Sequence, residues 1–149
     1  MIYLDIDDVM LTYADKANDP FNAPRHRMAV LNRICHYTKA PIVLSSDWRK
    51  GDTGMAFLKA HNLWDRSQYL LQGKDWHTPV HLTDLDDDLS VRGQYIAAHM
   101  AAHNVTRYLI IDDCPVLQSQ APGYLRIDPD IGLMDADYGR AVALWDGQA

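Results

Sequence analysis

The chain has 149 residues, of which 48% are hydrophobic and 23% charged, and its formal net charge is -6. This length and composition are typical of a globular protein, and we predict a single domain over residues 1–149. The net negative charge argues against a protein that coats nucleic acid. Because the sequence contains neither a long apolar run nor a basic, apolar leader, we expect a cytoplasmic protein without a membrane segment.

The hydrophobic pattern predicts strands that alternate with helices along the chain. The expected strands are residues 2–6, 41–46, 67–73, 107–113 and 123–128. The expected helices are residues 25–38, 54–62, 91–104 and 136–145, with residues 12–26 as a polar loop. This alternation indicates an α/β fold with a mostly parallel sheet covered by helices on both faces.

Acidic and hydroxyl side chains stand at the ends of three predicted strands. In chain order they are Asp5 and Asp7, then Ser45 and Ser46, then Asp112 and Asp113. Ligands of parallel α/β sheets bind beyond the carboxyl ends of the strands, so these groups converge if their strands are neighbours. A single acid at a strand end is often only a turn former or helix cap. Two acidic pairs and a serine pair favour a functional site, and clustered carboxylates with a phosphate favour Mg²⁺.

Three segments resemble a known family. YLDIDDVM, PIVLSSDWR and YLIIDDCP look like motifs I, II and IV of the haloacid dehalogenase-like (HAD) phosphohydrolases. The SSDWR segment, followed by SVRGQYI and LIIDD, is similar to the HAD domain of Swiss Army Knife RNA repair proteins. The resemblance implies a Rossmann-like HAD fold in one phosphohydrolase domain. It has two departures: Asp8 stands where many relatives carry Gly, and Arg92 where motif III usually has Lys.

The resemblance also implies roles in catalysis. Asp5 would be the nucleophile that forms an aspartyl-phosphate, and Asp7 would protonate the leaving oxygen and then activate water. Ser45 would hydrogen-bond a phosphate oxygen, and Arg92 would supply positive charge to the phosphoryl group. Three lysines are alternatives to Arg92 as the motif III cation, namely Lys50, Lys59 and Lys74.

Metal and substrate contacts follow from the same resemblance. Mg²⁺ would be bound by four aspartates, through the side chains of Asp5 and Asp112, the carbonyl of Asp7, and Asp113 directly or through water. The candidate substrate-binding residues are Ser46, Trp48 and Arg49. Trp48 and Arg49 form either a wall and a cation beside the leaving group, or a core tryptophan and a structural salt bridge. His99 and His103 are expected on an exposed helix face rather than in a zinc site.

We therefore predict a magnesium-dependent phosphomonoester hydrolase. Its substrates would be nucleic-acid end or nucleotide phosphates, with a small-molecule phosphatase as one alternative. A catalytically weak binding or signalling module is the alternative of another class, although response-regulator domains place their acids and lysine differently. Neither the stretch between Asp7 and Ser45 nor that between Ser45 and Arg92 has room for a cap domain, so we expect an open substrate mouth. No oligomeric state is predicted.

Overall fold

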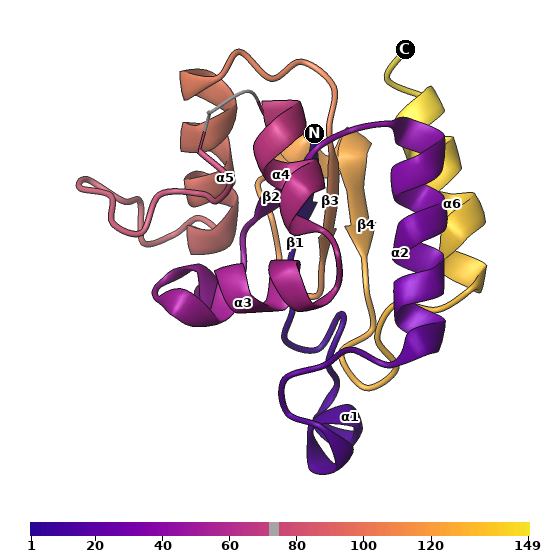
Figure 1. Cartoon of the computed structure of the whole chain (residues 1–149). Helices are drawn as coiled ribbons and strands as arrows, with labels where there is room; N and C mark the ends of the chain where they lie inside the picture. Colours follow the sequence, from indigo (N-terminus) through magenta and orange to yellow (C-terminus); the bar gives the residue numbers. More distant parts are fainter. Residues whose placement is uncertain (72–74) are drawn as a thin grey trace.

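Four parallel strands form a single sheet in the order β2-β1-β3-β4 in a computed structural model that describes residues 1–71 and 75–149 (Figure 1). The strands are β1 (Ile2–Leu4), β2 (Ile42–Leu44), β3 (Leu109–Asp112) and β4 (Tyr124–Arg126). β1 lies between β2 and β3, so Leu4 has Leu44 as its partner on one side and Ile111 on the other. The residues of β1, β2 and β3 are all buried, as expected for a parallel sheet covered on both faces.

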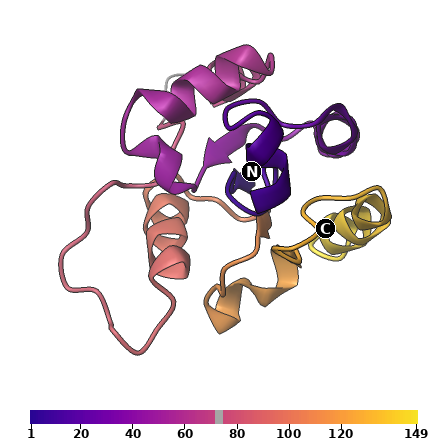
Figure 2. The ribbon, with the colours of Figure 1, turned by 90° about the horizontal axis from the view of Figure 1, so that it is seen from below.

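Helices cover both faces of this sheet. They are α1 (Tyr13–Asn18), α2 (Arg25–Thr38), α3 (Asp52–Ala60), α4 (Trp64–Leu71), α5 (Val91–Ala102) and α6 (Ala136–Asp146). Short 3-10 helices span Asp47–Arg49 and Gln118–Gly123. Figure 2 shows α2 and α6 side by side on one face and α5 on the opposite face. The predicted α/β class with a covered parallel sheet is confirmed.

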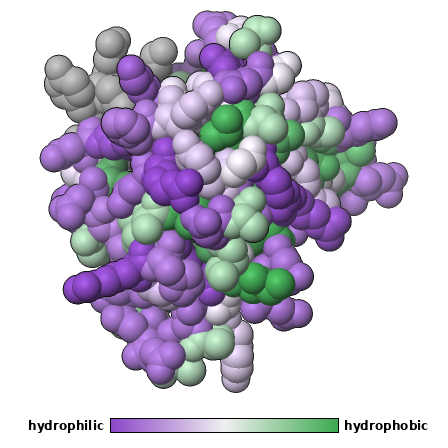
Figure 3. Space-filling view, turned by 90° about the vertical axis from the view of Figure 1, so that its right-hand side faces the viewer, coloured by the Kyte–Doolittle hydropathy of each residue, from purple (hydrophilic) through white to green (hydrophobic). Residues whose placement is uncertain are grey.

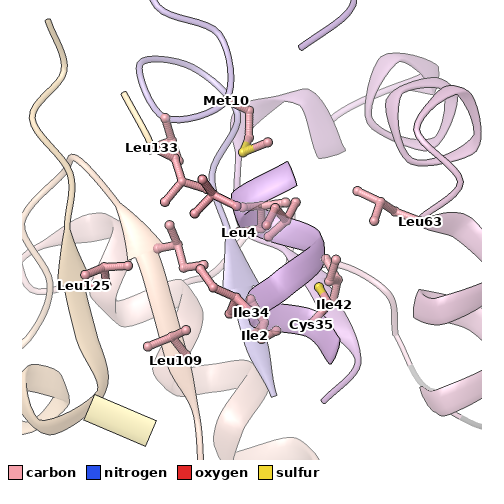
Figure 4. Packing of buried hydrophobic residues seen from close by; sticks show 14 of the residues in the cluster. Ile2, Leu4, Met10, Ile34, Cys35, Ile42, Leu63, Leu109, Leu125 and Leu133 are labelled. Atoms are coloured by element: carbon pink, nitrogen blue, oxygen red, sulfur yellow. The ribbon is translucent and has the colours of Figure 1, made fainter. Parts of the chain in front are cut away.

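The core has one part on each face of the sheet. Because alternate residues of a strand point to opposite faces, Ile2 and Leu4 pack against Ile34 of α2, while Tyr3 packs against Ile96 of α5. Figure 4 shows the first of these groups, in which side chains from the strands and α2 meet. The outer face over α2 and α6 is mostly hydrophilic, with smaller apolar patches between the polar side chains (Figure 3).

The strand predicted at residues 67–73 was wrong. Residues 67–71 belong to α4, and residues 72 and 73 lie outside the described part of the chain. Ser67 and Leu71 are both buried, and this spacing of four places them on one face of a helix. Beside β2, the backbone N–H of Thr78 donates to the carbonyl of Leu44 at 3.0 Å, so a short bridge occupies the place of the predicted strand.

The loop predicted at residues 12–26 was wrong in part, because it contains α1. The Thr12 hydroxyl accepts from the N–H of Asp15 at 3.2 Å, and the Asp15 carboxylate accepts from the N–H of Thr12 at 2.9 Å. This reciprocal capping stabilises a helix that has no buried residue.

In the described residues, neither of the two segments in which a cap domain could be inserted contains one. Between β1 and β2 the chain forms α1 and α2, and between β2 and α5 it forms α3, α4 and a loop beside α5 that projects outward (Figure 1). Among the described residues, no helix is both long enough and apolar enough to cross a membrane.

Candidate active site

The ends of β1, β2 and β3 bring the predicted acids and serines together. The N–H of Asp5 donates to the carbonyl of Ile111 at 3.0 Å, and the N–H of Ser45 donates to the carbonyl of Leu4 at 3.0 Å. These bonds fix Asp5 between the end of β2 and the end of β3. Asp5, Ser45 and Asp112 are all buried, with exposed fractions of 2%, 1% and 0%. The sequence predicted that these side chains meet at the carboxyl ends of the strands, and the structure places them there.

Arg92 extends from the first turn of α5 into the group of acids. Its Nη1 lies 3.2 Å from Asp5 Oδ1, 3.4 Å from Asp112 Oδ2 and 2.5 Å from the carbonyl oxygen of Ser45. Burial alone would lower the pKa of Arg92, but the neighbouring Asp5 and Asp112 raise it above its ordinary value. The guanidinium is therefore a permanent cation beside the candidate nucleophile.

The three competing lysines are placed differently. Lys50 pairs with Asp47 at 2.9 Å, and the Lys59 ammonium lies 5.3 Å from the centre of the Trp64 ring. Lys74 lies outside the described residues. The geometry therefore favours Arg92 as the motif III cation.

The buried acids hold their protons more tightly than ordinary carboxyls. Burial raises the pKa of Asp5 to about 6, although Arg92 opposes the shift. Burial, and then the charge of Asp5, raise the pKa of Asp112 to about 7. Burial also raises the pKa of Asp113. The single positive charge of Arg92 therefore does not balance the negative charge that these carboxyls would carry when ionised.

The donor set fits a hard divalent cation. Among the described residues, Asp112 Oδ2 and Ser45 Oγ are buried without a hydrogen-bond partner, so each has an unused acceptor position. Ligand atoms of Asp112, Asp113 and Cys114 all lie within 4.8 Å of one another. Carboxylate oxygens are the ligands that Mg²⁺ prefers. Burial, followed by Asp112 and Asp113, raises the pKa of the Cys114 thiol to about 11, so this sulfur is a neutral neighbour in the absence of metal.

Asp7 makes its contacts apart from the buried acids. The Trp48 indole Nε1–H donates to Asp7 Oδ2 at 3.2 Å, and Lys16 Nζ lies 2.6 Å from Asp7 Oδ1. The side chain of Asp7 is 41% exposed. Sequence reasoning missed Lys16, although the Thr12 and Asp15 pair is a helix-capping signal that could have placed it on a helix.

The turn after Asp7 explains one departure from the family pattern. Asp8 has a φ of 60°, in the left-handed region that glycine adopts without steric cost. Aspartate tolerates this region better than most residues, so the turn forms here without glycine.

The candidate substrate-binding residues mostly have structural contacts. The Arg49 guanidinium is buried and donates to the carbonyls of Ser46 at 3.0 Å and of Pro79 at 2.9 Å. The Ser46 hydroxyl is fully buried, accepts from the N–H of Trp48 at 3.4 Å and lowers the pKa of Asp5 against the larger effect of burial. Trp48 packs edge-on against Phe57, with ring centres 5.8 Å apart. For Arg49 these bonds favour the structural alternative.

A hollow of about 430 Å³ opens beside Arg92, between the 3-10 helix Asp47–Arg49 and α5. Its lining includes Arg49, Lys50, Arg92 and Tyr95. The Arg49 guanidinium lies 5.1 Å from the centre of the Tyr95 ring. The carboxylate of Asp47 also lines the hollow, so three cations and one acid lie there beside an aromatic ring, next to the candidate phosphate site. Sequence reasoning did not identify Tyr95.

Comparison with known families agrees with this arrangement. The family model described as the HAD domain in Swiss Army Knife RNA repair proteins matches residues 1–138. The chain belongs to this family. The match extends past the motif IV acids of this HAD domain and into α6, so it covers every strand of the sheet. No match was found among curated proteins or among solved structures. The chain is thus a HAD-type phosphohydrolase, a class that typically uses a divalent metal.

Proposed function

We propose that this HAD domain is a magnesium-dependent phosphomonoesterase that works through an aspartyl-phosphate on Asp5. The observation that carries the proposal is the grouping at the strand ends. There the buried Asp5 carboxylate lies 3.2 Å from the Arg92 cation, beside Ser45 and the buried Asp112. A cation next to the nucleophile offsets the repulsion that an anionic phosphate would meet from the carboxylates.

The chemistry uses two carboxyl groups in turn. An oxygen of Asp5 attacks phosphorus, the bond from phosphorus to the leaving oxygen breaks, and the Asp7 carboxyl gives that oxygen its proton. Asp7, now a carboxylate, takes a proton from water, and the hydroxide attacks phosphorus and releases Asp5 with inorganic phosphate. Arg92 and the Ser45 hydroxyl would bind the phosphoryl oxygens throughout.

Mg²⁺ would be held by the Asp5, Asp112 and Asp113 carboxylates and the Asp7 carbonyl. When bound, it would neutralise the negative charge shared by these carboxylates and the phosphate.

For the substrate we favour a phosphate on a nucleic-acid end. The absence of a cap domain in the described residues leaves the candidate site open, and the neighbouring hollow carries Lys50 and Tyr95, suited to a second phosphate and a base. The family's association with RNA repair supports the same class. A phosphatase of small metabolites is the alternative, and it predicts higher rates on free nucleotides or sugar phosphates.

Turnover of p-nitrophenyl phosphate tests the chemistry. We expect activity that depends on Mg²⁺, that EDTA abolishes and that added Mg²⁺ restores. Asp5→Asn should remove turnover while leaving the circular dichroism spectrum and melting temperature near those of the wild type, because the substitution changes an oxygen to nitrogen without changing shape. Activity of Asp5→Asn above about a few per cent of wild type, or full activity in EDTA, would contradict the proposal.

A further inference from the structure

We infer that Trp48 and Lys16 are positioning residues that fix the orientation of Asp7 for proton transfer to the leaving group. The inference rests on the proposed function, because Asp7 transfers this proton only in a phosphatase. It assigns Trp48 a role different from stacking on a base, and it gives a role to α1, the helix that carries Lys16.

Each oxygen of the Asp7 carboxylate has its own donor. Oδ2 accepts from the Trp48 indole at 3.2 Å, and Oδ1 lies 2.6 Å from the Lys16 ammonium. The donors come from two elements that are separated in the sequence by α2 and β2, namely α1 and the 3-10 helix Asp47–Arg49. A carboxylate held at both oxygens cannot rotate freely, although its side chain is 41% exposed. General acid catalysis requires this kind of fixed geometry.

The Trp48 indole is itself fixed in place. Its ring meets Phe57 edge-on at 5.8 Å and 81°, and its backbone N–H bonds the hydroxyl of Ser46 at 3.4 Å. Ser46 is fully buried beside Asp5. Trp48 therefore contacts the candidate acid Asp7 through its indole and, through its backbone, Ser46, which lies beside the candidate nucleophile Asp5.

Lys16 is held through α1 rather than through apolar packing. α1 has no buried residue, but Asp15 in its first turn accepts from Arg27 of α2 at 2.8 Å. Arg27 is buried and also donates to the carbonyl of Leu133 at 3.1 Å. This chain of polar contacts sets the place of α1, and so the place from which Lys16 reaches Asp7.

The chemistry predicts which substrates should reveal this role. When the bond from phosphorus to the leaving oxygen breaks, an alkoxide needs the proton of Asp7 far more than p-nitrophenolate does. Misorientation of Asp7 should therefore lower kcat/KM, which reports the steps up to departure of the leaving group, for alkyl phosphates and largely spare kcat/KM for p-nitrophenyl phosphate. The later step, in which Asp7 activates water, is common to both substrates and does not enter kcat/KM. A purely structural role would slow both substrates by the same factor.

The test compares Trp48→Phe and Lys16→Met on an alkyl phosphate and on p-nitrophenyl phosphate, with Mg²⁺ present. Trp48→Phe keeps an aromatic ring against Phe57 and removes the N–H donor. We expect kcat/KM for the alkyl phosphate to fall about tenfold and kcat/KM for p-nitrophenyl phosphate by about twofold or less, a part of what general acid catalysis contributes. Lys16→Arg, which keeps a cationic donor, should retain most of the wild-type kcat/KM for the alkyl phosphate.

Matched controls lie elsewhere in the chain. Trp64→Phe and Lys59→Met alter a second tryptophan and a second lysine that contact each other on α4 and α3, and both should leave the ratio of the two rates unchanged. In an Asp7→Asn background, Trp48→Phe should have no further effect on the alkyl phosphate, because it acts through Asp7.

Three outcomes would overturn the inference. They are an equal loss of kcat/KM on both substrates, a higher kcat/KM for the alkyl phosphate in Trp48→Phe or Lys16→Met, and a further loss of kcat/KM when Trp48→Phe is added to Asp7→Asn. These results are distinct from failure of the proposed function, which would appear as a wild type no more active than Asp5→Asn. Melting temperatures of all variants show whether a loss comes from unfolding, and Lys16→Met tests the inference even if Trp48→Phe is unstable.

Discussion

A single guanidinium nitrogen of Arg92 contacts three oxygens, on Asp5, Asp112 and the carbonyl of Ser45. Arginine stays charged under all conditions in which the fold exists, whereas a buried lysine loses its proton more readily. Arg in place of the usual Lys therefore suits a cation that is largely buried among carboxylates, as Arg92 is here. Even so, the pKa of Asp112 is raised to about 7, first by burial and then by Asp5, so Arg92 does not fully compensate the acids.

This imbalance predicts how the metal-free protein responds to pH. A carboxyl with a raised pKa in the folded protein binds its proton more tightly there than in the unfolded chain. Its contribution to stability is complete below the ordinary pKa and is lost as the pH rises through about 7. Asp112→Asn removes this titration. In EDTA, the variant should melt at a higher temperature than the wild type at about pH 8, and the difference should be smaller at about pH 5.

The measurement is a set of melting curves for both proteins at the two pH values, with and without Mg²⁺. Added Mg²⁺ should raise the melting temperature of the wild type at the higher pH and have little effect on the variant, which lacks one charged ligand. A variant that melts below the wild type at about pH 8 in EDTA would show that Asp112 stabilises the metal-free fold.

At the scale of elements, α5 determines where Arg92 lies. Ser90 caps the helix by accepting from the N–H of Gly93 at 2.9 Å, and its hydroxyl donates to the carbonyl of Pro115. Gly93 packs so closely that an added Cβ would lie 2.5 Å from the backbone nitrogen of Leu117. α5 can therefore pack this closely against the loop after β3 only because Gly93, the residue after Arg92, has no side chain.

Gly93→Ala should displace α5 and carry Arg92 away from Asp5. We expect a loss of about 1–3 kcal/mol of stability, the usual cost of overpacking, together with a clear fall in kcat for p-nitrophenyl phosphate. Gly139→Ala on α6 is the matched control, because an added Cβ there meets no atom of the described residues within 4 Å. It should stabilise the protein by about 0.5–1 kcal/mol and leave kcat unchanged. Denaturant unfolding and steady-state kinetics on both variants check this, and unaltered kinetics in Gly93→Ala would contradict it.

Local patterns predicted most of these elements because their signals are themselves local. The helix predicted at residues 25–38 has the bounds of α2, where apolar residues recur on one face, Pro24 precedes the helix and Lys39 ends it in the left-handed region. α1 was missed because it is short and buries none of its residues, so it has no apolar stripe that faces the core. Residues 67–71 contain a short apolar run that fits either a strand or a helix, and only packing decides between them.

The same reasoning separates the parts of the site that were predicted from those that were not. The acids and serines follow apolar strands, so sheet geometry alone brings them together. The contact of Trp48 with Asp7 joins residues 41 positions apart, and no pattern in the sequence indicates it. His99, expected on an exposed face, is buried and bonds the hydroxyl of Tyr3 at 3.0 Å. That expectation was wrong because the helix packs against the sheet on the side that carries this histidine.

At the scale of the whole molecule, the charges are unevenly placed. The net charge is -6, yet the charged lining of the hollow beside the candidate site consists of one acid, Asp47, and three cations, Arg49, Lys50 and Arg92. A local group of cations in an acidic protein can hold one or two phosphates but cannot follow a long backbone. An open site also obtains little binding energy by enclosing a small substrate, so the contacts beside the reacting phosphate must supply discrimination.

Oligonucleotides that carry a terminal phosphate should therefore be better substrates than the matching mononucleotides, measured as kcat/KM. The preference should weaken only gently with salt, with a logarithmic slope of about -0.7 for each phosphate contacted outside the reacting group. Lys50→Met should lower kcat/KM for the oligonucleotide more than for p-nitrophenyl phosphate, because only the oligonucleotide reaches the hollow. Lys59→Met, which removes a lysine that lies against Trp64 instead, is the charge-matched control and should keep the preference. Equal or higher kcat/KM on free mononucleotides or sugar phosphates would instead identify a phosphatase of small metabolites, with the same chemistry at Asp5 and a different use of the hollow.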